Sequence, residues 1–113
     1  MDTVSAVVDR FNEAWNAHDL EAALALCTED VLFDSTDPAP DGVRHEGKPA
    51  VRAAWEPVFN TAGARFTTED SFSVGDRLVQ MWRFEWEGGH VRGVDVIRVR
   101  DGLVSEKLAY VKG

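Results

Sequence analysis

The chain has 113 residues, of which 44% are hydrophobic and 28% charged, and it carries a formal net charge of −8 at pH 7. This length accommodates one domain around a single core, and the negative charge argues against nucleic acid, because phosphate binding requires a basic surface. No apolar run reaches the roughly 18 residues of a membrane span, and the N-terminus lacks the features of a signal peptide. With Cys27 as the only cysteine, we expect a cytoplasmic protein that binds no membrane.

The sequence pattern of the first half of the chain predicts three helices and two short strands. Apolar residues recur at helical spacing over residues 2–16, and Asp19 is a good N-cap for a second, shorter helix. The segment "DVLFDS" predicts a short strand, "TDPAPDG" a turn-rich loop and "VRHE" a brief strand. A third helix starts near Pro49, where a first helical turn tolerates proline, and Pro57 should kink or shorten it.

The second half predicts an antiparallel sheet. Three two-residue turn signals separate four strands. The turns are Gly75-Asp76, Gly88-Gly89 and Asp101-Gly102, and the strands cover residues 66–74, 77–87, 90–100 and 103–111. Helices come first and an antiparallel sheet second, which predicts the α+β fold class.

Two-residue turns fix the register of the sheet. They place Asp95 opposite Trp82 on one side and opposite Leu108 on the other, with Glu106 and Tyr110 on the same face. This face combines aromatic and aliphatic residues with a few polar groups, which is typical of a ligand pocket and also of a core. A buried carboxylate costs several kcal/mol unless it is paired, hydrogen-bonded or neutralised. Asp95 is therefore either a functional group or a structural carboxylate that an indole N–H or a histidine satisfies.

The opposite face of the sheet has an apolar centre and a charged rim, which predicts a subunit interface. The centre consists of Val79, Met81, Val94, Val96 and Ala109. The first hairpin has two alternatives: a strict two-residue turn places Phe66 and Phe72 on this outer face, and a bulge places both on the inner face.

Three segments together resemble the nuclear transport factor 2-like superfamily, in its SnoaL-like and ketosteroid isomerase-like branch. They are "FNEAWNAHDLEAALALCTEDVLF", "GKPAVRAAWEPVF" and "GVDVIRVRDGLVSEKLAYV". The resemblance implies a single SnoaL-like domain over residues 1–113, in which a cone-shaped, curved antiparallel sheet wraps around N-terminal helices (a cystatin-like α+β barrel). It also implies a homodimer through the convex sheet face.

The resemblance implies acid/base chemistry at the pocket. Asp95 matches the aspartic acid that stays protonated and donates a hydrogen bond to the substrate oxyanion in ketosteroid isomerases. Phe11 occupies the position of the family's oxyanion tyrosine, so that hydroxyl is absent. The family's proton-shuttling aspartate falls in "FDSTDP", where Ser35 aligns without gaps and Asp34 or Asp37 needs a small shift. SnoaL-like cyclases also use a pocket carboxylate as acid or base.

The predicted site combines three carboxylates with aromatic walls. The catalytic candidates are Asp95, Glu106 and Asp34, and the ligand-binding candidates are Trp15, Phe11, Phe33, Trp55, Trp82 and Tyr110. We expect an acid/base isomerase, cyclase or dehydratase that acts on a flat apolar polyketide- or steroid-like ligand through an enol-like intermediate. The alternative is a non-catalytic small-molecule binding protein. No metal-ligand spacing and no phosphate-binding glycine loop is present, so we expect no metal, no nucleotide and no other cofactor.

Overall fold

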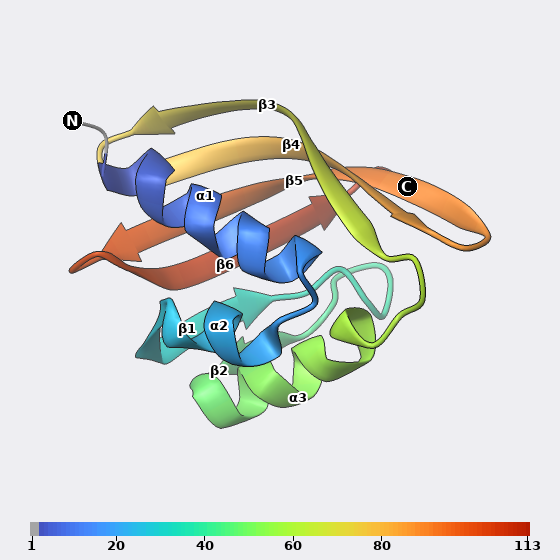
Figure 1. The fold of residues 1–113 in the computed structure, drawn as a ribbon, viewed down its shortest axis with the longest axis horizontal. Coiled ribbons are helices and arrows are strands. Elements are labelled where there is room, and N and C mark those ends of the chain that lie inside the picture. The colour runs from blue at the N-terminus through green and yellow to red at the C-terminus, as the bar shows by residue number, and fades with distance from the viewer. Residues whose placement is uncertain (1–2) are drawn as a thin grey trace.

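The computed structural model describes residues 3–113 and shows helices packed against a curved, six-stranded sheet (Figure 1). The helices are α1 (Thr3–Asn16), α2 (Leu20–Ala25) and α3 (Lys48–Phe59); the strands are β1 (Cys27–Asp34), β2 (Arg44–Glu46), β3 (Arg65–Val74), β4 (Arg77–Trp86), β5 (Gly89–Arg100) and β6 (Leu103–Val111). The strand order is β2-β1-β6-β5-β4-β3, and only the β1–β6 pair is parallel. The predicted α+β class and curved sheet are confirmed.

The helices follow the predicted periodicity. The apolar stripe of α1 is buried against the concave face of the sheet, which α1 crosses in Figure 1. The Asp19 carboxylate caps α2 by accepting a hydrogen bond from the Ala22 N–H at 3.0 Å. Helix α3 starts with Pro49 in its first turn and continues past Pro57 to Phe59. None of the helices described in residues 3–113 is long and apolar enough to cross a membrane.

The core lies between the helices and the concave face. Phe11 of α1, Trp55 of α3, Val31 of β1 and Ile97 of β5 have no exposed surface. Phe11 and Trp55 meet edge to face with ring centroids 5.7 Å apart, which is a favourable aromatic geometry. The aromatic residues predicted from the helix stripes therefore join α1 to α3 above the sheet.

The β4–β5 hairpin has a different register from the predicted one. Trp86 pairs with Gly89, so the turn residues are Glu87 and Gly88, and Trp82 lies opposite Gly93 instead of Asp95. A Cβ atom at Gly89 would lie 3.3 Å from the Trp86 indole, so glycine lets the ring pack across the strand. The register moves by two residues, and each side chain keeps its predicted face because the period of a strand is two.

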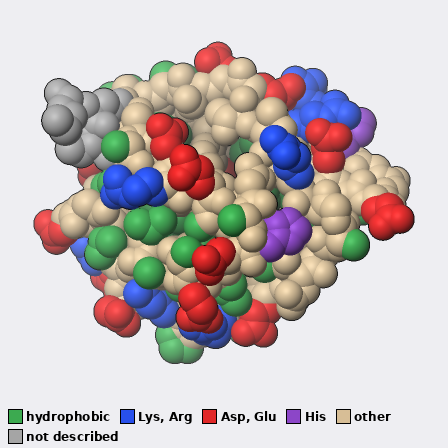
Figure 2. All heavy atoms as spheres, viewed as in Figure 1, with side chains coloured by type: hydrophobic (Ala, Val, Ile, Leu, Met, Phe, Trp, Pro, Cys, Tyr) green, Lys and Arg blue, Asp and Glu red, His purple; other side chains and the backbone are tan. Residues whose placement is uncertain are grey.

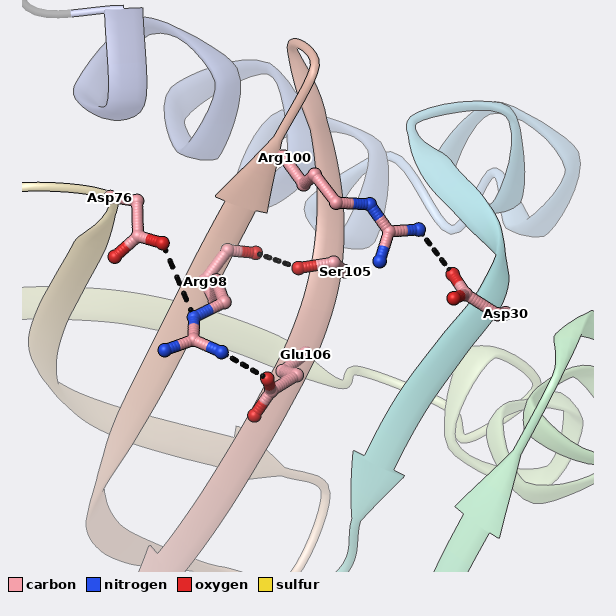
Figure 3. A network of polar contacts seen from close by, with 6 residues as sticks. All are labelled: Asp30, Asp76, Arg98, Arg100, Ser105 and Glu106. Carbon is pink, nitrogen blue, oxygen red and sulfur yellow. Dashed lines mark hydrogen bonds and ion pairs between the residues drawn. The ribbon is translucent and has the colours of Figure 1, made fainter.

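The β5–β6 hairpin contains a bulge that reverses the predicted faces of β6. Val104 pairs with Val99, but Glu106 pairs with Arg98, so Ser105 is the extra residue. Figure 3 shows the Ser105 hydroxyl at the Arg98 carbonyl oxygen, to which it donates at 3.3 Å. The predicted inward positions of Glu106, Leu108 and Tyr110 are therefore wrong, because one inserted residue turns every later side chain to the opposite face.

A second bulge lies in β3. Thr68 pairs with Trp82 and Asp70 with Met81, which leaves Glu69 as the extra residue. Phe66 therefore lies on the concave face beside Trp82, with ring centroids 5.6 Å apart. Phe72 lies on the convex face and is 52% exposed. Neither of the two predicted arrangements occurs, because this bulge lies between the two phenylalanines.

Candidate functional site

A cavity of about 400 Å³ lies between α3, the end of α1 and the concave face of the sheet. Its wall is mainly apolar, and its volume suits a small organic ligand. The lining residues are Trp15, Phe33, Ser35, Thr36, Asp37, His45, Ala53, Ala54, Pro57, Val58, Phe66, Trp82, Phe84, Val91, Asp95, Lys107 and Ala109. The cavity thus has the aromatic walls that the sequence predicts, with one buried acid and one buried base in its lining.

Asp95 is the buried carboxylate of this cavity. It lies on β5 and is only 2% exposed. Its Oδ2 atom accepts a hydrogen bond from the Gln80 amide nitrogen at 3.0 Å, and the Gln80 amide oxygen accepts one from the Asn12 amide at 2.8 Å. Its Oδ1 atom has no hydrogen-bond partner among residues 3–113. One oxygen is therefore held in place by Gln80, and the other is unpaired in the described part of the chain.

Lys107 is the buried base, and the sequence analysis did not identify it. The Ser105 bulge turns it inward from β6, and it is 6% exposed. Its ammonium lies over the Trp15 ring, 4.1 Å from the centroid, where cation–π attraction is favourable. Four more rings lie 5.5–6.0 Å from this nitrogen, namely Phe33, Phe66, Trp55 and Phe11.

The surroundings of Lys107 disfavour the charged form of its side chain. Burial lowers the pKa of Lys107, and the negative charge of Asp95 offsets this only in part. Within residues 3–113, no carboxylate forms an ion pair with its ammonium. Lys107 and Asp95 are diagonal neighbours on the concave face, because Lys107 pairs with Ile97 and Asp95 pairs with Ala109. An acid and a base therefore project into the same apolar cavity from neighbouring strands.

Two indole N–H groups are further donors at the cavity wall. The Nε1 atoms of Trp15 and Trp82 are buried without a hydrogen-bond partner in the described part of the chain. A buried donor that stays unpaired costs about 1–3 kcal/mol. Since both residues line the cavity, their N–H groups are candidate donors to a ligand oxygen.

The predicted site residues fall into two groups. Asp95, Trp15, Phe33 and Trp82 line the cavity, whereas Trp55 and Phe11 lie behind its wall as core residues. Three candidates lie outside the cavity. Tyr110 is 60% exposed on the convex face, Glu106 accepts a hydrogen bond from Arg98 at 3.0 Å, and Asp34 lies 3.5 Å from the Arg44 guanidinium. The structure does not bring Glu106 or Asp34 to Asp95.

Outside the cavity, the polar groups of the described residues include a single thiol and a set of ion pairs on the convex side. No cluster of three or more potential metal ligands occurs among the histidine, cysteine and acidic residues of positions 3–113. Burial raises the pKa of Cys27 to about 12, so its thiol is not a ready nucleophile. Arg98 lies between Asp76 and Glu106 on the convex side (Figure 3), and on the face in Figure 2 basic side chains lie among acidic ones.

Comparisons with known proteins agree with this architecture. The family model of the SnoaL-like domain matches residues 8–107. An NTF2-like protein of unknown function from Mesorhizobium loti is 38% identical, with 99% of this chain and 93% of that chain covered and a TM-score of 0.88. No curated protein matches the sequence.

Two similar solved structures of lower sequence identity are a protein in complex with a small molecule and a designed small-molecule binder. The Rv0760c protein of Mycobacterium tuberculosis, in complex with estradiol-17β-hemisuccinate, is 28% identical over 97% of this chain and 94% of that chain, with a TM-score of 0.81. A computationally designed 17-OHP binder is 27% identical over 97% of this chain and 91% of that chain, with a TM-score of 0.83. Since the family model covers most of the chain and the fold is that of NTF2-like proteins, this protein belongs to the SnoaL-like domain family.

Proposed function

We propose that this protein is an enzyme that moves a proton on a flat, apolar ligand with a carbonyl group. The single observation that carries this proposal is the Asp95 carboxylate, which is 2% exposed, held at one oxygen by Gln80 and unpaired at the other. A carboxylate in an apolar cavity is a suitable general base for a carbon-bound proton next to a carbonyl. The product of that step is an enol-like intermediate, common to isomerisation, cyclisation and dehydration.

The aromatic wall favours a polyketide- or steroid-like ligand. Trp15, Phe66 and Trp82 offer rings against which a flat ligand can pack. The free N–H groups of Trp15 and Trp82 are donors toward an oxygen that gains negative charge, which partly replaces the tyrosine hydroxyl that Phe11 lacks. The steroid complex of the M. tuberculosis protein and the designed 17-OHP binder support the same ligand class.

The test is proton exchange on a β,γ-unsaturated steroid ketone in D₂O. We expect the wild-type protein to accelerate deuterium uptake next to the carbonyl, followed by mass spectrometry. Asp95→Asn should lower this rate about 100- to 10,000-fold, since it removes the base. Asp101→Asn is the matched control, because Asp101 lies in the exposed β5–β6 turn at φ 54°, a conformation that asparagine also adopts.

Two outcomes contradict this assignment. Full exchange activity in Asp95→Asn excludes Asp95 as the base. A loss in Glu106→Gln or Asp34→Asn as large as in Asp95→Asn moves the proton transfer to a carboxylate outside the cavity. Circular dichroism of each variant separates loss of chemistry from loss of fold.

The second candidate function is binding of the same ligand class without catalysis. The observation that favours it is Phe11, which is fully buried where the family's oxyanion tyrosine stands. On this alternative, tryptophan fluorescence reports saturable binding of steroids or anthraquinones, and the wild-type protein exchanges no protons faster than buffer. The same D₂O experiment therefore discriminates the two candidates. A cytoplasmic location, which the single cysteine predicts, is part of both.

We also propose a homodimer through the convex face. Val79, Met81, Val94 and Val96 form its apolar centre, and the β6 bulge adds Leu108 and Tyr110 beside them. Tyr110 is 60% and Met81 36% exposed, and Phe72 extends the patch on β3. A continuous apolar patch of this kind is typical of a surface that a partner covers.

Met81→Lys combined with Val94→Lys is expected to give monomers. These residues pair directly across β4 and β5, so the double variant places two like charges at the centre of the patch. Sedimentation velocity at micromolar concentration measures the change, and Val43→Lys is the control, because Val43 is exposed in the loop before β2. A wild-type protein that is already monomeric refutes the interface.

A further inference from the structure

We propose that the Lys107 amine is a nucleophile that captures an aldehyde or ketone ligand as an imine inside the aromatic cavity. This inference rests on the proposed function, since it needs a ligand with a carbonyl group. It adds a covalent step and a second reacting residue, and it restricts the ligand to carbonyl compounds whose carbonyl carbon reaches the floor of the cavity.

Lys107 differs from an ordinary surface lysine in its burial, in its lack of an ion pair within residues 3–113 and in its position at the cavity. Lysine is almost never fully buried unless it is paired, yet Lys107 is 6% exposed and forms no ion pair within residues 3–113. The other two lysines of the chain differ: Lys48 lies 3.4 Å from Glu29, and Lys112 is exposed. Only Lys107 lines the cavity.

The surroundings keep part of Lys107 in the reactive form. An amine is a nucleophile only when it is deprotonated, and desolvation in an apolar pocket is one way in which enzymes activate lysine. Burial among five aromatic rings lowers the pKa of Lys107. The same rings surround the nitrogen on the side of the cavity next to Asp95.

In imine formation, Asp95 carries protons from the Lys107 nitrogen to the carbonyl oxygen. The lone pair of the Lys107 nitrogen forms a bond to the carbonyl carbon, and the carbonyl oxygen receives a proton and becomes the hydroxyl of a carbinolamine. The nitrogen then loses its remaining protons as the hydroxyl leaves as water, so that one amine and one carbonyl give one imine and one water. Asp95 supplies protons to the oxygen and accepts them from nitrogen through its free Oδ1, and is unchanged overall.

The imine explains how the cavity stabilises an enol-like intermediate without the missing tyrosine hydroxyl. The imine nitrogen takes up one proton from the solvent, and the protonated imine then accepts the electron pair left when the Asp95 carboxylate removes the adjacent carbon-bound proton. The product is an enamine. Lys107 and Asp95 are diagonal neighbours on one face, a Cα separation of roughly 7–8 Å. Both side chains line the same cavity, so a carbonyl carbon and its neighbouring carbon can face Lys107 and Asp95 together.

The competing interpretation of Lys107 is an ammonium that binds a ligand carboxylate, but the geometry favours the imine. Asp95 projects into the same cavity, and its charge repels a second carboxylate there. The aromatic rings surround the amine, and within residues 3–113 no carboxylate forms an ion pair with it. The carboxylate alternative is included in the experiment as an outcome.

The experiment is reductive trapping of 2-naphthaldehyde with sodium cyanoborohydride near neutral pH. We expect one naphthylmethyl adduct per chain that peptide mapping assigns to Lys107. Lys107 should be labelled about tenfold or more faster than Lys48 and Lys112, because desolvation activates a lysine amine, whereas Lys48 is ion-paired with Glu29 and Lys112 is exposed. Lys107→Arg keeps the charge and Lys107→Met keeps the apolar length, and both should lose this adduct; Lys48→Arg is the matched control that should retain it.

The outcomes separate this inference from the proposed function. Labelling that spreads evenly over the three lysines, or saturable binding of the aldehyde without an adduct on Lys107, overturns the imine, while proton exchange that depends on Asp95 would still support the proposed function. Tight binding of 2-naphthoate that Lys107→Met abolishes, with no trapping of the aldehyde, also overturns it in favour of a carboxylate ligand. Selective labelling of Lys107 without any proton exchange supports the imine and refutes the proposed catalysis.

Discussion

Gly93→Ala is expected to lower the free energy of unfolding by about 3 kcal/mol, as forced overpacking of a closed interior does. A Cβ atom at position 93 would lie 2.2 Å from the Tyr110 carbonyl oxygen and 2.5 Å from a carbon of the Trp82 ring. A backbone oxygen cannot rotate away, so the end of β6 would have to move. Urea unfolding monitored by tryptophan fluorescence measures the loss.

Gly89→Ala is the matched control for this prediction, because Gly89 lies on the same strand. There the nearest atom to an added Cβ is at 3.3 Å and belongs to the Trp86 ring, which is 37% exposed and free to move. We expect a change below about 1 kcal/mol for this variant. Equal stability of Gly93→Ala and wild type would mean that Trp82 does not pack over Gly93, and the cavity wall described above would be wrong.

Lys107→Met is expected to raise the free energy of unfolding by about 1–4 kcal/mol at neutral pH, a range typical of replacing buried charges by apolar groups. The sign follows from the lowered pKa of Lys107, which burial causes. Between this lowered value and the unfolded value of about 10.4, the unfolded chain binds more protons than the folded one. The free energy of unfolding of the wild type therefore rises with pH between these two pKa values. The cost of burying the Lys107 ammonium is largest at a pH below both values.

The pH dependence of the stability difference between Lys107→Met and the wild type tests whether the buried ammonium is destabilising. The advantage of Lys107→Met should shrink as pH rises from about 7 to about 10, because the wild-type amine is then increasingly neutral in both states. Urea unfolding across this range measures the gap, and Lys112→Met is the control, since Lys112 is exposed and should show no such trend. A gap that stays constant or widens with pH would contradict a destabilised ammonium at position 107.

Much of the architecture was determined by local sequence. The stripes of α1 and α3 follow from helical spacing, because a helix with one apolar face buries it whatever the partner is. Turn signals located the three hairpins, and alternation placed Asp95 and Trp82 on the concave face. The β4–β5 register error left these faces unchanged because it was two residues, a full strand period.

The chemical content of the cavity was decided by tertiary structure. The inserted Ser105 and Glu69 each shift a strand by one residue, which exchanges its faces. No local signal marks these positions, because a bulge forms where the twist and packing of neighbouring strands require it. The Ser105 bulge brings Lys107 into the cavity and moves Glu106 to the convex side. The sequence thus determined that a carboxylate would lie in an aromatic pocket, and the strand packing decided that its neighbour is an amine.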